Sequence, residues 1–372
     1  MSFSYLKSDY EERINEKGKK DRIENKQRIN ISDHAYLTLQ NDMEIFLPQS
    51  VQSDLGKIPS GLINRIFRNF RKSADSSIAC RLGEKKMEYE HLLAKEKFGE
   101  KKKIISVFIE DYKAKLLQEA ERRLKEKGNS FYFRIDRDNL LYLVSEEGQD
   151  EKDYYKDNIS FYIKAVIEEY AEMPYIEREF IYHRELVDEI ELAKSEQKVL
   201  KIILKNERDG KNNIKYVKVL GIYRDKEYLY NYVAGLMCDN RKGDWKPGAV
   251  RLTSVNDCDR LEQSAFISKE NRDLVAEIIK RQGVQYLPAG DCDYRVVVEF
   301  TPKGEKMYQK MLHLRPLYVK RASERIYEFI CPKLQAQSYF FRFGQEAKIL
   351  EPPDLAEEFL KRYQSAAKKY QI

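Results

Sequence analysis

The sequence contains little that would support a disulfide framework, a zinc site or a membrane span. Its five cysteines are far apart and odd in number, and none forms a C-x-x-C pair. Disulfide frameworks and thiolate zinc sites both need cysteines at close or regular spacing. Residues 1–20 lack the apolar core of a signal peptide, and no apolar run elsewhere reaches the length needed to cross a bilayer. We therefore expect a cytoplasmic protein that binds no metal.

The signatures of common enzyme classes are also missing. The chain has no phosphate-binding G-x-x-x-x-G-K-S/T, no dinucleotide-binding G-x-G-x-x-G, no zinc-protease H-E-x-x-H and no nucleophile-elbow G-x-S-x-G. Its four histidines show no ligand spacing. We therefore expect a protein that is not an enzyme and uses no cofactor. A nuclease built from carboxylates stays open as an alternative, because such residues come together only in the fold.

Charge is distributed unevenly along the chain. The formal net charge of +6 is modest for 372 residues. Residues 57–86 hold eight Lys and Arg against two acids, a local net charge of +6, whereas residues 144–191 hold fifteen acids against five bases, a net charge of −10. A basic region of this kind predicts a surface that faces a polyanion. For the acidic region we favour an ordinary solvated helix face.

The first part of the chain predicts an arm, a strand and two helices. The length suggests two to three domains, and polar, aperiodic composition predicts a flexible arm over residues 1–24. Within a first domain at residues 25–85, apolar and polar side chains alternate over residues 26–32, which indicates a strand. A helix that Pro48 closes follows, and Pro59-Ser60 then opens a second amphipathic helix.

This order of elements resembles the ribbon-helix-helix family. A single strand needs a partner for its backbone groups, and a second copy of the chain is the simplest supplier. The resemblance implies an intertwined homodimer whose two-stranded ribbon enters the DNA major groove and whose second helix meets a phosphate. On the matching positions, it implies nucleic-acid contacts from Lys26, Arg28, Asn30, Ser60 and Arg65.

Residues 86–190 read as a helical connector that contains a β-hairpin. Apolar positions recur at helical spacing from about residue 105 to residue 117, as expected for a long helix that packs against a neighbour or a dimer mate. Two apolar runs at residues 130–136 and 139–145 flank Arg137-Asp138 and predict the hairpin. Further amphipathic helices are expected before residue 198.

Residues 198–255 read as consecutive strands. Four apolar runs, at residues 199–205, 214–224, 227–237 and 249–255, are separated by short charged or glycine-containing turns, without an intervening helix. That pattern predicts a small, strongly bent antiparallel barrel of SH3-like or Sm-like type. The expected fold class is therefore a multidomain α+β protein.

The barrel region resembles the WYL domain. Glu227-Tyr228-Leu229 stands at the family's Trp-Tyr-Leu position, with Glu in place of Trp, and residues 250–255 match the family's closing element around Arg251. The ending 343–352, followed by a long final helix, is typical of WYL-family regulators. The resemblance implies a WYL domain over residues 191–268 and a C-terminal α/β domain that dimerises over residues 269–372.

In this family the barrel is expected to bind a negatively charged nucleotide or nucleic-acid strand. Cations that alternate with rings suit a single strand, because phosphates are neutralised while exposed bases stack. A single tyrosine in a small barrel is more often part of the core than of a binding site. For Trp245 two interpretations stay open, an exposed stacking residue or an anchor of its loop. The candidate ligand-binding residues are Lys201, Lys205, Lys215, Lys218, Arg224, Tyr228, Tyr230 and Arg251.

The arrangement as a whole resembles the WYL accessory proteins of type VI-D CRISPR systems. The resemblance implies a homodimer that binds single-stranded RNA, and possible DNA binding is left open. It also implies a partner, the RNA-guided type VI-D effector, whose RNA cleavage the protein would stimulate. Two alternatives remain: a ligand-responsive DNA-binding transcriptional regulator whose barrel senses a nucleotide, and a purely structural dimer scaffold.

Overall fold

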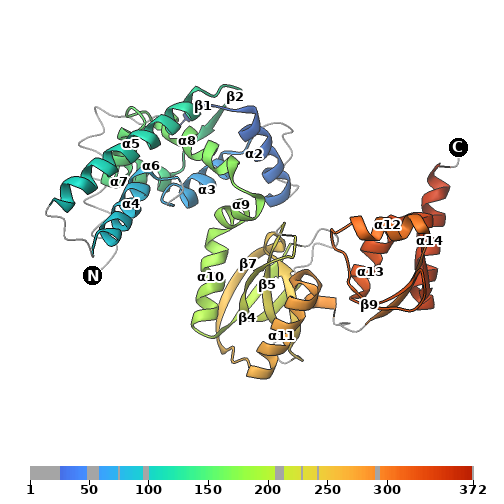
Figure 1. Ribbon diagram of the computed structural model, residues 1–372. Helices are drawn as coiled ribbons and strands as arrows, with labels where there is room; N and C mark the ends of the chain where they lie inside the picture. Colours follow the sequence, from blue (N-terminus) through green and yellow to red (C-terminus); the bar gives the residue numbers. More distant parts are fainter. Residues whose placement is uncertain are drawn as a thin grey trace. The chain divides into compact units, whose positions relative to one another are not determined.

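The computed structural model of the protein describes residues 26–47, 58–73, 76–94, 100–205, 213–227, 229–240, 243–289 and 294–370. The chain forms two compact units, Met1–Pro174 and Tyr175–Ile372, which we describe one at a time. It is a mixed α+β protein whose sheets are antiparallel (Figure 1). None of the helices in the described ranges is long and apolar enough to cross a membrane.

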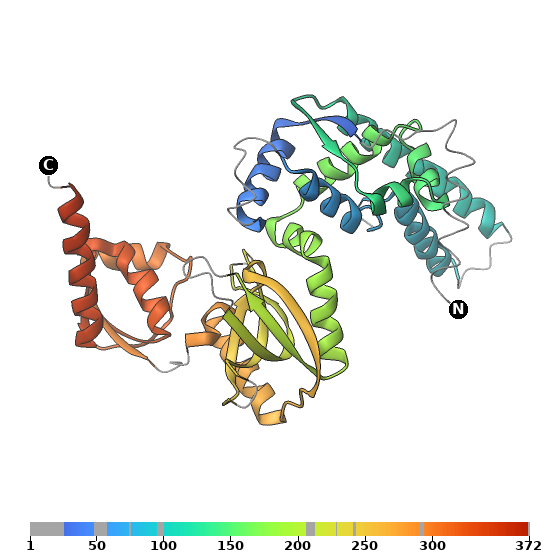
Figure 2. The ribbon, with the colours of Figure 1, turned by 180° about the vertical axis from the view of Figure 1, so that it is seen from behind.

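The N-terminal unit contains a two-stranded ribbon with helices packed on one side of it. Strand β1 (Lys26–Ile31) pairs antiparallel with β2 (Asn129–Arg134) along its whole length, and Figure 2 shows the two strands side by side. The inward-facing Ile29, Ile31 and Phe133 are buried. The helices of this unit are α2 (Asp33–Phe46), α3 (Ser60–Phe70), α4 (Ile78–Leu92), α5 (Lys101–Lys125), α6 (Arg137–Leu143), α7 (Glu146–Asp153) and α8 (Ile159–Glu172).

The predicted order of strand, helix and helix is present, but the predicted partner of the strand is wrong. We expected the strand at residues 26–32 to pair with a second copy of the chain. In the structure β2 of the same chain supplies that partner, with Lys26 opposite Arg134 and Ile31 opposite Asn129. Because the backbone groups of β1 find partners within the chain, the argument for an intertwined ribbon no longer holds.

The predicted β-hairpin is also wrong. Residues 130–136 include β2, but the second run, residues 139–145, belongs mostly to α6. The Asp136 side chain accepts a hydrogen bond from the Asn139 backbone N–H at 2.9 Å and so begins this helix as its N-cap. A short apolar run does not distinguish helix from strand by periodicity alone, so the cap decided the outcome.

The C-terminal unit begins with two helices and a five-stranded antiparallel sheet in the order β6-β5-β4-β3-β7. The predicted strand at residues 249–255 is divided, because the short η2 turn (Leu252–Ser254) separates β6 from β7. No ladder in the described residues joins β6 to β7 to close the predicted barrel. The elements are α9 (Tyr175–Tyr182), α10 (Arg184–Ser195), β3 (Lys198–Leu204), β4 (Asn213–Arg224), β5 (Asn231–Cys238), β6 (Lys246–Arg251) and β7 (Val255–Ser264).

Both faces of this sheet are covered. Ile190 and Ala193 of α10 pack on one face with core residues of β3, β4 and β5. Helix α11 (Lys269–Gln282) and the η3 turn (Val284–Ala289) pack on the other face, which we call the α11 face. Burial on both sides explains why β5 reads as a nearly continuous apolar run rather than an alternating one.

The last part of the chain is a β-α-β-β-α-β arrangement with sheet order β11-β8-β10-β9. The mixture of strands and helices expected in this region is present. Its elements are β8 (Arg295–Phe300), α12 (Pro302–Lys310), β9 (Tyr318–Arg321), β10 (Ile326–Ile330), α13 (Lys333–Phe340), η4 (Phe341–Glu346), β11 (Ala347–Glu351) and α14 (Pro353–Tyr370).

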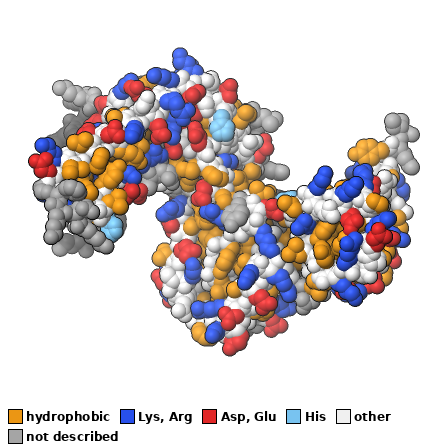
Figure 3. Space-filling model, in the orientation of Figure 1, with side chains coloured by type: hydrophobic (Ala, Val, Ile, Leu, Met, Phe, Trp, Pro, Cys, Tyr) orange, Lys and Arg blue, Asp and Glu red, His pale blue; other side chains and the backbone are white. Residues whose placement is uncertain are grey.

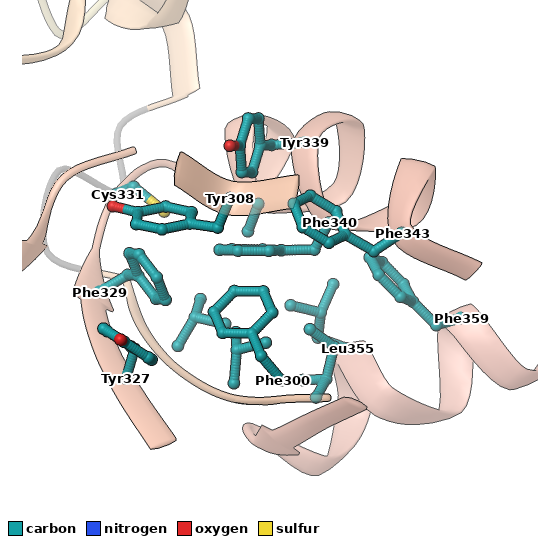
Figure 4. Packing of buried hydrophobic residues seen from close by; sticks show 14 residues of the cluster. Phe300, Tyr308, Tyr327, Phe329, Cys331, Tyr339, Phe340, Phe343, Leu355 and Phe359 are labelled. Carbon is teal, nitrogen blue, oxygen red and sulfur yellow. The ribbon is translucent and has the colours of Figure 1, made fainter. Parts of the chain in front are cut away.

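Aromatic side chains fill the core between this sheet and its helices. The Phe300 ring lies at the centre, with centroid distances of 5.6 Å to Tyr308 and 5.5 Å to both Tyr327 and Phe343. Figure 4 shows these rings pointing toward one another from strands and helices. Edge and tilted contacts of this kind add to the free energy gained by burying each ring.

Thr301 connects the start of α12 to the end of η4. Its hydroxyl accepts a hydrogen bond from the Gly304 N–H at 3.0 Å and donates one to the Glu346 carboxylate. We expect Thr301→Ala to destabilise α12 by about 1 kcal/mol, as is typical for a lost N-cap. Amide hydrogen exchange across α12 should then become roughly fivefold faster. Thr301→Ser keeps the hydroxyl and should exchange like the wild type; equal rates in all three proteins would contradict the role of the cap.

Candidate nucleic-acid interface

The outer side of the β1–β2 ribbon is polar and basic. Side chains of a strand alternate between faces, so every second residue of each strand points away from the core. The register places Lys26 opposite Arg134, Arg28 opposite Tyr132 and Asn30 opposite Ser130, all on the outward face. We call these six residues the ribbon face.

Tyr132 is the centre of the ribbon face. Its side chain is 59% exposed, and its ring lies 4.8 Å from the Lys26 ammonium and 5.8 Å from the Arg28 guanidinium carbon. Within the described ranges, no carboxylate forms an ion pair with Lys26, Arg28 or Arg134. In Figure 3, Lys and Arg side chains lie along the edge of the N-terminal unit that carries β1 and β2. An exposed ring bordered by cations can hold a stacked base while phosphates are neutralised beside it.

Asn30 has a structural role that differs from the predicted one. Its amide donates to the Ser130 hydroxyl at 2.7 Å and to the Gly128 carbonyl at 3.3 Å, and its oxygen accepts from the Gly128 N–H at 3.1 Å. These bonds hold the start of β2 against β1. The amide is therefore engaged within the chain rather than free to read a base edge.

Ser60 likewise forms a hydrogen bond to the ribbon, whereas the prediction gave it a contact with a phosphate. Its hydroxyl accepts the Arg134 N–H at 3.0 Å, and Asn64 of the same helix donates to the Arg134 carbonyl at 2.7 Å. The N-terminus of α3 is thus occupied by the end of β2. Arg65, the other predicted contact on α3, is half-buried and interacts within the chain.

Three of the six cations predicted on the five-stranded sheet are paired with carboxylates. Lys201 lies 3.2 Å from Asp259, Lys215 forms an ion pair with Asp239, and Arg224 forms one with Glu177. The sequence predicted that these three cations would bind a ligand, but each is paired with an acid of the same chain. Lys205 is half-buried and has partners in the chain, and Tyr228 lies outside the described residues.

Arg251 is the predicted sheet residue with the most distinctive surroundings. Its guanidinium carbon lies 4.0 Å from the centroid of the Tyr230 ring, and its Nε donates to the Tyr232 hydroxyl at 3.1 Å. Tyr232 is only 7% exposed and belongs to the core of the α11 face, so this tyrosine is structural. Burial raises the pKa of the Tyr232 hydroxyl, although the bond from Arg251 opposes that shift. Arg251 and the half-buried Tyr230 together form what we call the arginine site.

Helix α9 supports the arginine site through a buried carboxylate that the sequence did not suggest. Glu179 is fully buried; it accepts hydrogen bonds from the Asn231 N–H at 3.1 Å, the Asn231 amide at 2.7 Å and the Thr253 N–H at 3.2 Å. Burial raises the pKa of Glu179, and the bonds from Asn231 and Thr253 partly offset that shift. Because Asn231 follows Tyr230 and Thr253 lies two residues after Arg251, Glu179 fixes the backbone on both sides of the site.

The turn at the predicted WYL tripeptide contacts the last domain. Glu227 accepts a hydrogen bond from the Leu314 N–H at 2.8 Å and lies 3.1 Å from His313 Nδ1. Partial burial opposes the shift, but these two partners lower the pKa of Glu227 overall. Glu227 therefore acts as an acceptor between the turn after β4 and the segment before β9.

Comparisons with known proteins identify the fold but no family. No family model matches the chain, and no curated protein matches it. Among solved structures, the crystal structure of a CRISPR Cas-related protein is similar over 93% of this chain and 94% of that chain, with a TM-score of 0.72 and 22% sequence identity. This chain shares the fold of that protein.

A second solved structure is much less similar. Proteasome accessory factor B/C (PafBC) of Arthrobacter aurescens aligns over 91% of this chain and 54% of that chain, with a TM-score of 0.27 and 12% identity. In the described part of this chain, no group of three or more His, Cys, Asp or Glu side chains is placed to hold a metal ion.

Proposed function

We propose that this chain is a non-enzymatic regulator that binds single-stranded RNA through the ribbon face. The observation that carries the proposal is the exposed Tyr132 ring, which has Lys26 and Arg28 beside it and Arg134 on the same face. Exposed aromatic rings are suited to stack an unpaired base, and nearby cations neutralise its phosphates. Among the described residues, no acid is paired with these cations to repel or displace a phosphate.

The arrangement favours an unpaired strand over a duplex. Bases in a duplex are stacked on one another and offer no free face to a tyrosine ring. Groove reading by a ribbon needs free donors and acceptors, but the Asn30 amide is bonded to Ser130 and Gly128. The ribbon face therefore fits stacking and phosphate contact better than reading of base edges.

The finer assignments belong to the same proposal. We propose that the five-stranded sheet is a WYL domain, that the protein acts as a homodimer, and that it stimulates an RNA-guided effector of the type VI-D class. The strand order, the arginine site and the order of elements in the last domain support the WYL assignment. The shared fold with a CRISPR Cas-related protein supports the choice of partner class.

The arginine site should contribute a second, weaker contact. We expect Arg251→Ala to weaken binding of single-stranded RNA by roughly fivefold, the loss of about 1 kcal/mol from one cationic contact. Arg224→Ala is the matched control, because Arg224 is already paired with Glu177. Its affinity should stay within a factor of about two. Fluorescence anisotropy with a labelled oligonucleotide measures both; equal losses would remove the arginine site from the interface.

The test of the proposed function is a competition experiment. The full-length protein is bound to a fluorescent single-stranded RNA, and unlabelled single-stranded RNA, single-stranded DNA and duplex DNA are added in turn. We expect the single strands to displace the probe at far lower concentrations than the duplex does, and binding to weaken steeply as salt is raised. Displacement by one duplex sequence alone would favour the DNA-binding transcriptional regulator instead. No binding at micromolar protein would refute both.

A further inference from the structure

A second ring and cation cluster lies on the α11 face, at the opposite end of β5 from the arginine site. The Lys218 ammonium lies 4.8 Å from the centroid of the Trp245 ring and donates a hydrogen bond to the Phe266 carbonyl at 3.1 Å. Within the described ranges, Lys218 has no carboxylate partner. The Phe266 side chain is 66% exposed. We call these three residues the Trp245 cluster.

The backbone of Phe266 is anchored although its side chain faces solvent. Its neighbours in the chain, Ala265 and Ile267, are 7% and 4% exposed. The Ala265 N–H donates to the Gln197 carbonyl at 2.7 Å, and Lys218 holds the Phe266 carbonyl. An exposed phenyl ring on a backbone fixed at three consecutive residues loses little conformational freedom when a planar group stacks on it.

Trp245 and Lys218 supply the rest of the cluster. Trp245 is half-buried and packs against the core of the α11 face, which fixes the position of its indole. The indole and the Phe266 carbonyl hold the Lys218 ammonium between them, so the cation is positioned before any ligand arrives. A fixed cation beside an exposed ring matches a nucleotide, with its phosphate on the cation and its base on the ring.

We infer that the Trp245 cluster binds one nucleotide unit of the single-stranded RNA, with its base stacked on Phe266 and its phosphate on Lys218. This inference rests on the proposed function and adds a contact on the C-terminal unit. The same chemistry suits a free mononucleotide, so the experiment includes both ligands.

Trp245 is the only tryptophan in the chain, so its fluorescence reports on this cluster alone. The full-length protein is titrated with oligouridine RNA and, separately, with adenosine monophosphate, while anisotropy of a labelled RNA follows overall binding. We expect RNA to change Trp245 emission and to saturate at the concentration that saturates anisotropy. Phe266→Ala should weaken the emission change and raise the RNA concentration needed for half-saturation roughly tenfold. Lys218→Met keeps an apolar stem of similar length and should reduce the salt dependence by about one phosphate contact.

Leu312→Ala is the matched control, because Leu312 is also 66% exposed and lies outside the cluster. It should bind RNA like the wild type. Anisotropy that saturates without a change in Trp245 emission, with Phe266→Ala binding normally, would overturn the inference and leave the proposed function standing. An emission change with adenosine monophosphate but no RNA binding would keep the cluster as a nucleotide site and overturn the proposed function.

Discussion

Tyr132→Ala should weaken binding of single-stranded RNA by roughly 5-fold to 150-fold, the range expected when one base loses its stacking platform at about 1–3 kcal/mol. The ring is 59% exposed, so its removal leaves the fold intact while removing the surface between Lys26 and Arg28. Isothermal titration or anisotropy at fixed salt measures the effect. The salt dependence should change little, because all cations of the ribbon face remain.

Tyr132→Phe is the matched control for this substitution. It retains the ring face and loses only the hydroxyl, so its affinity should stay within about twofold of the wild type. Removing both Lys26 and Arg28 by mutation to Ala should show the opposite pattern, a weaker affinity together with a shallower salt dependence. Tyr132→Ala and Tyr132→Phe with indistinguishable affinities would show that the ring does not stack a base.

Glu179→Ala should destabilise the C-terminal unit by about 3 kcal/mol, because one buried and one partly buried backbone N–H group each lose an acceptor at about 1–3 kcal/mol. Those groups belong to Asn231 and Thr253, and the Asn231 side chain loses one of its two acceptors as well. For a unit of this size, the midpoint of thermal unfolding should fall by about 6–12 °C. Differential scanning calorimetry of the full-length protein measures this shift.

Glu177→Ala is the matched control, because it also removes an acid from α9 but one that is not buried. Glu177 lies on the same helix, but it is 41% exposed in its ion pair with Arg224. An exposed pair of this kind contributes about 1 kcal/mol or less. The two variants should therefore differ several-fold in their effect on stability, and comparable destabilisation by both would contradict the role given to Glu179.

The elements that depend on local signals could be predicted from the sequence. Ile29 and Ile31 alternate with polar residues in the predicted strand, which forms β1, and the consecutive apolar runs after residue 198 contain β3, β4, β5 and β6. The polar strand β7 was not predicted beyond its first residue. The partner of β1 could not be predicted, because β2 lies about a hundred residues further along the chain and no local pattern specifies that pairing. The apolar run at residues 139–145 is too short for its periodicity to distinguish a helix from a strand. The N-cap at Asp136 begins a helix there.

The sequence predicted the kinds of residue in the candidate site better than it predicted their arrangement. Lys26 and Arg28 were correctly placed on the outward face of a strand, but Tyr132 and Arg134 were missed because β2 was assigned to a hairpin. The alternation of residues 129–134 contained the signal for both. On the sheet, the sequence showed the cations but not the acids Asp259, Asp239 and Glu177 that pair with them, since ion pairs between distant residues depend on the fold.

The most direct test of the account is a photo-crosslinking experiment. Full-length protein is bound to single-stranded RNA that contains 5-iodouridine, irradiated and digested, and the crosslinked peptides are identified by mass spectrometry. Because this base crosslinks to aromatic rings that it touches, we expect Tyr132 to be a principal site and its yield to fall when unlabelled single-stranded RNA competes. Efficient crosslinking with none on residues 129–134 would contradict the proposal that the ribbon face holds the RNA.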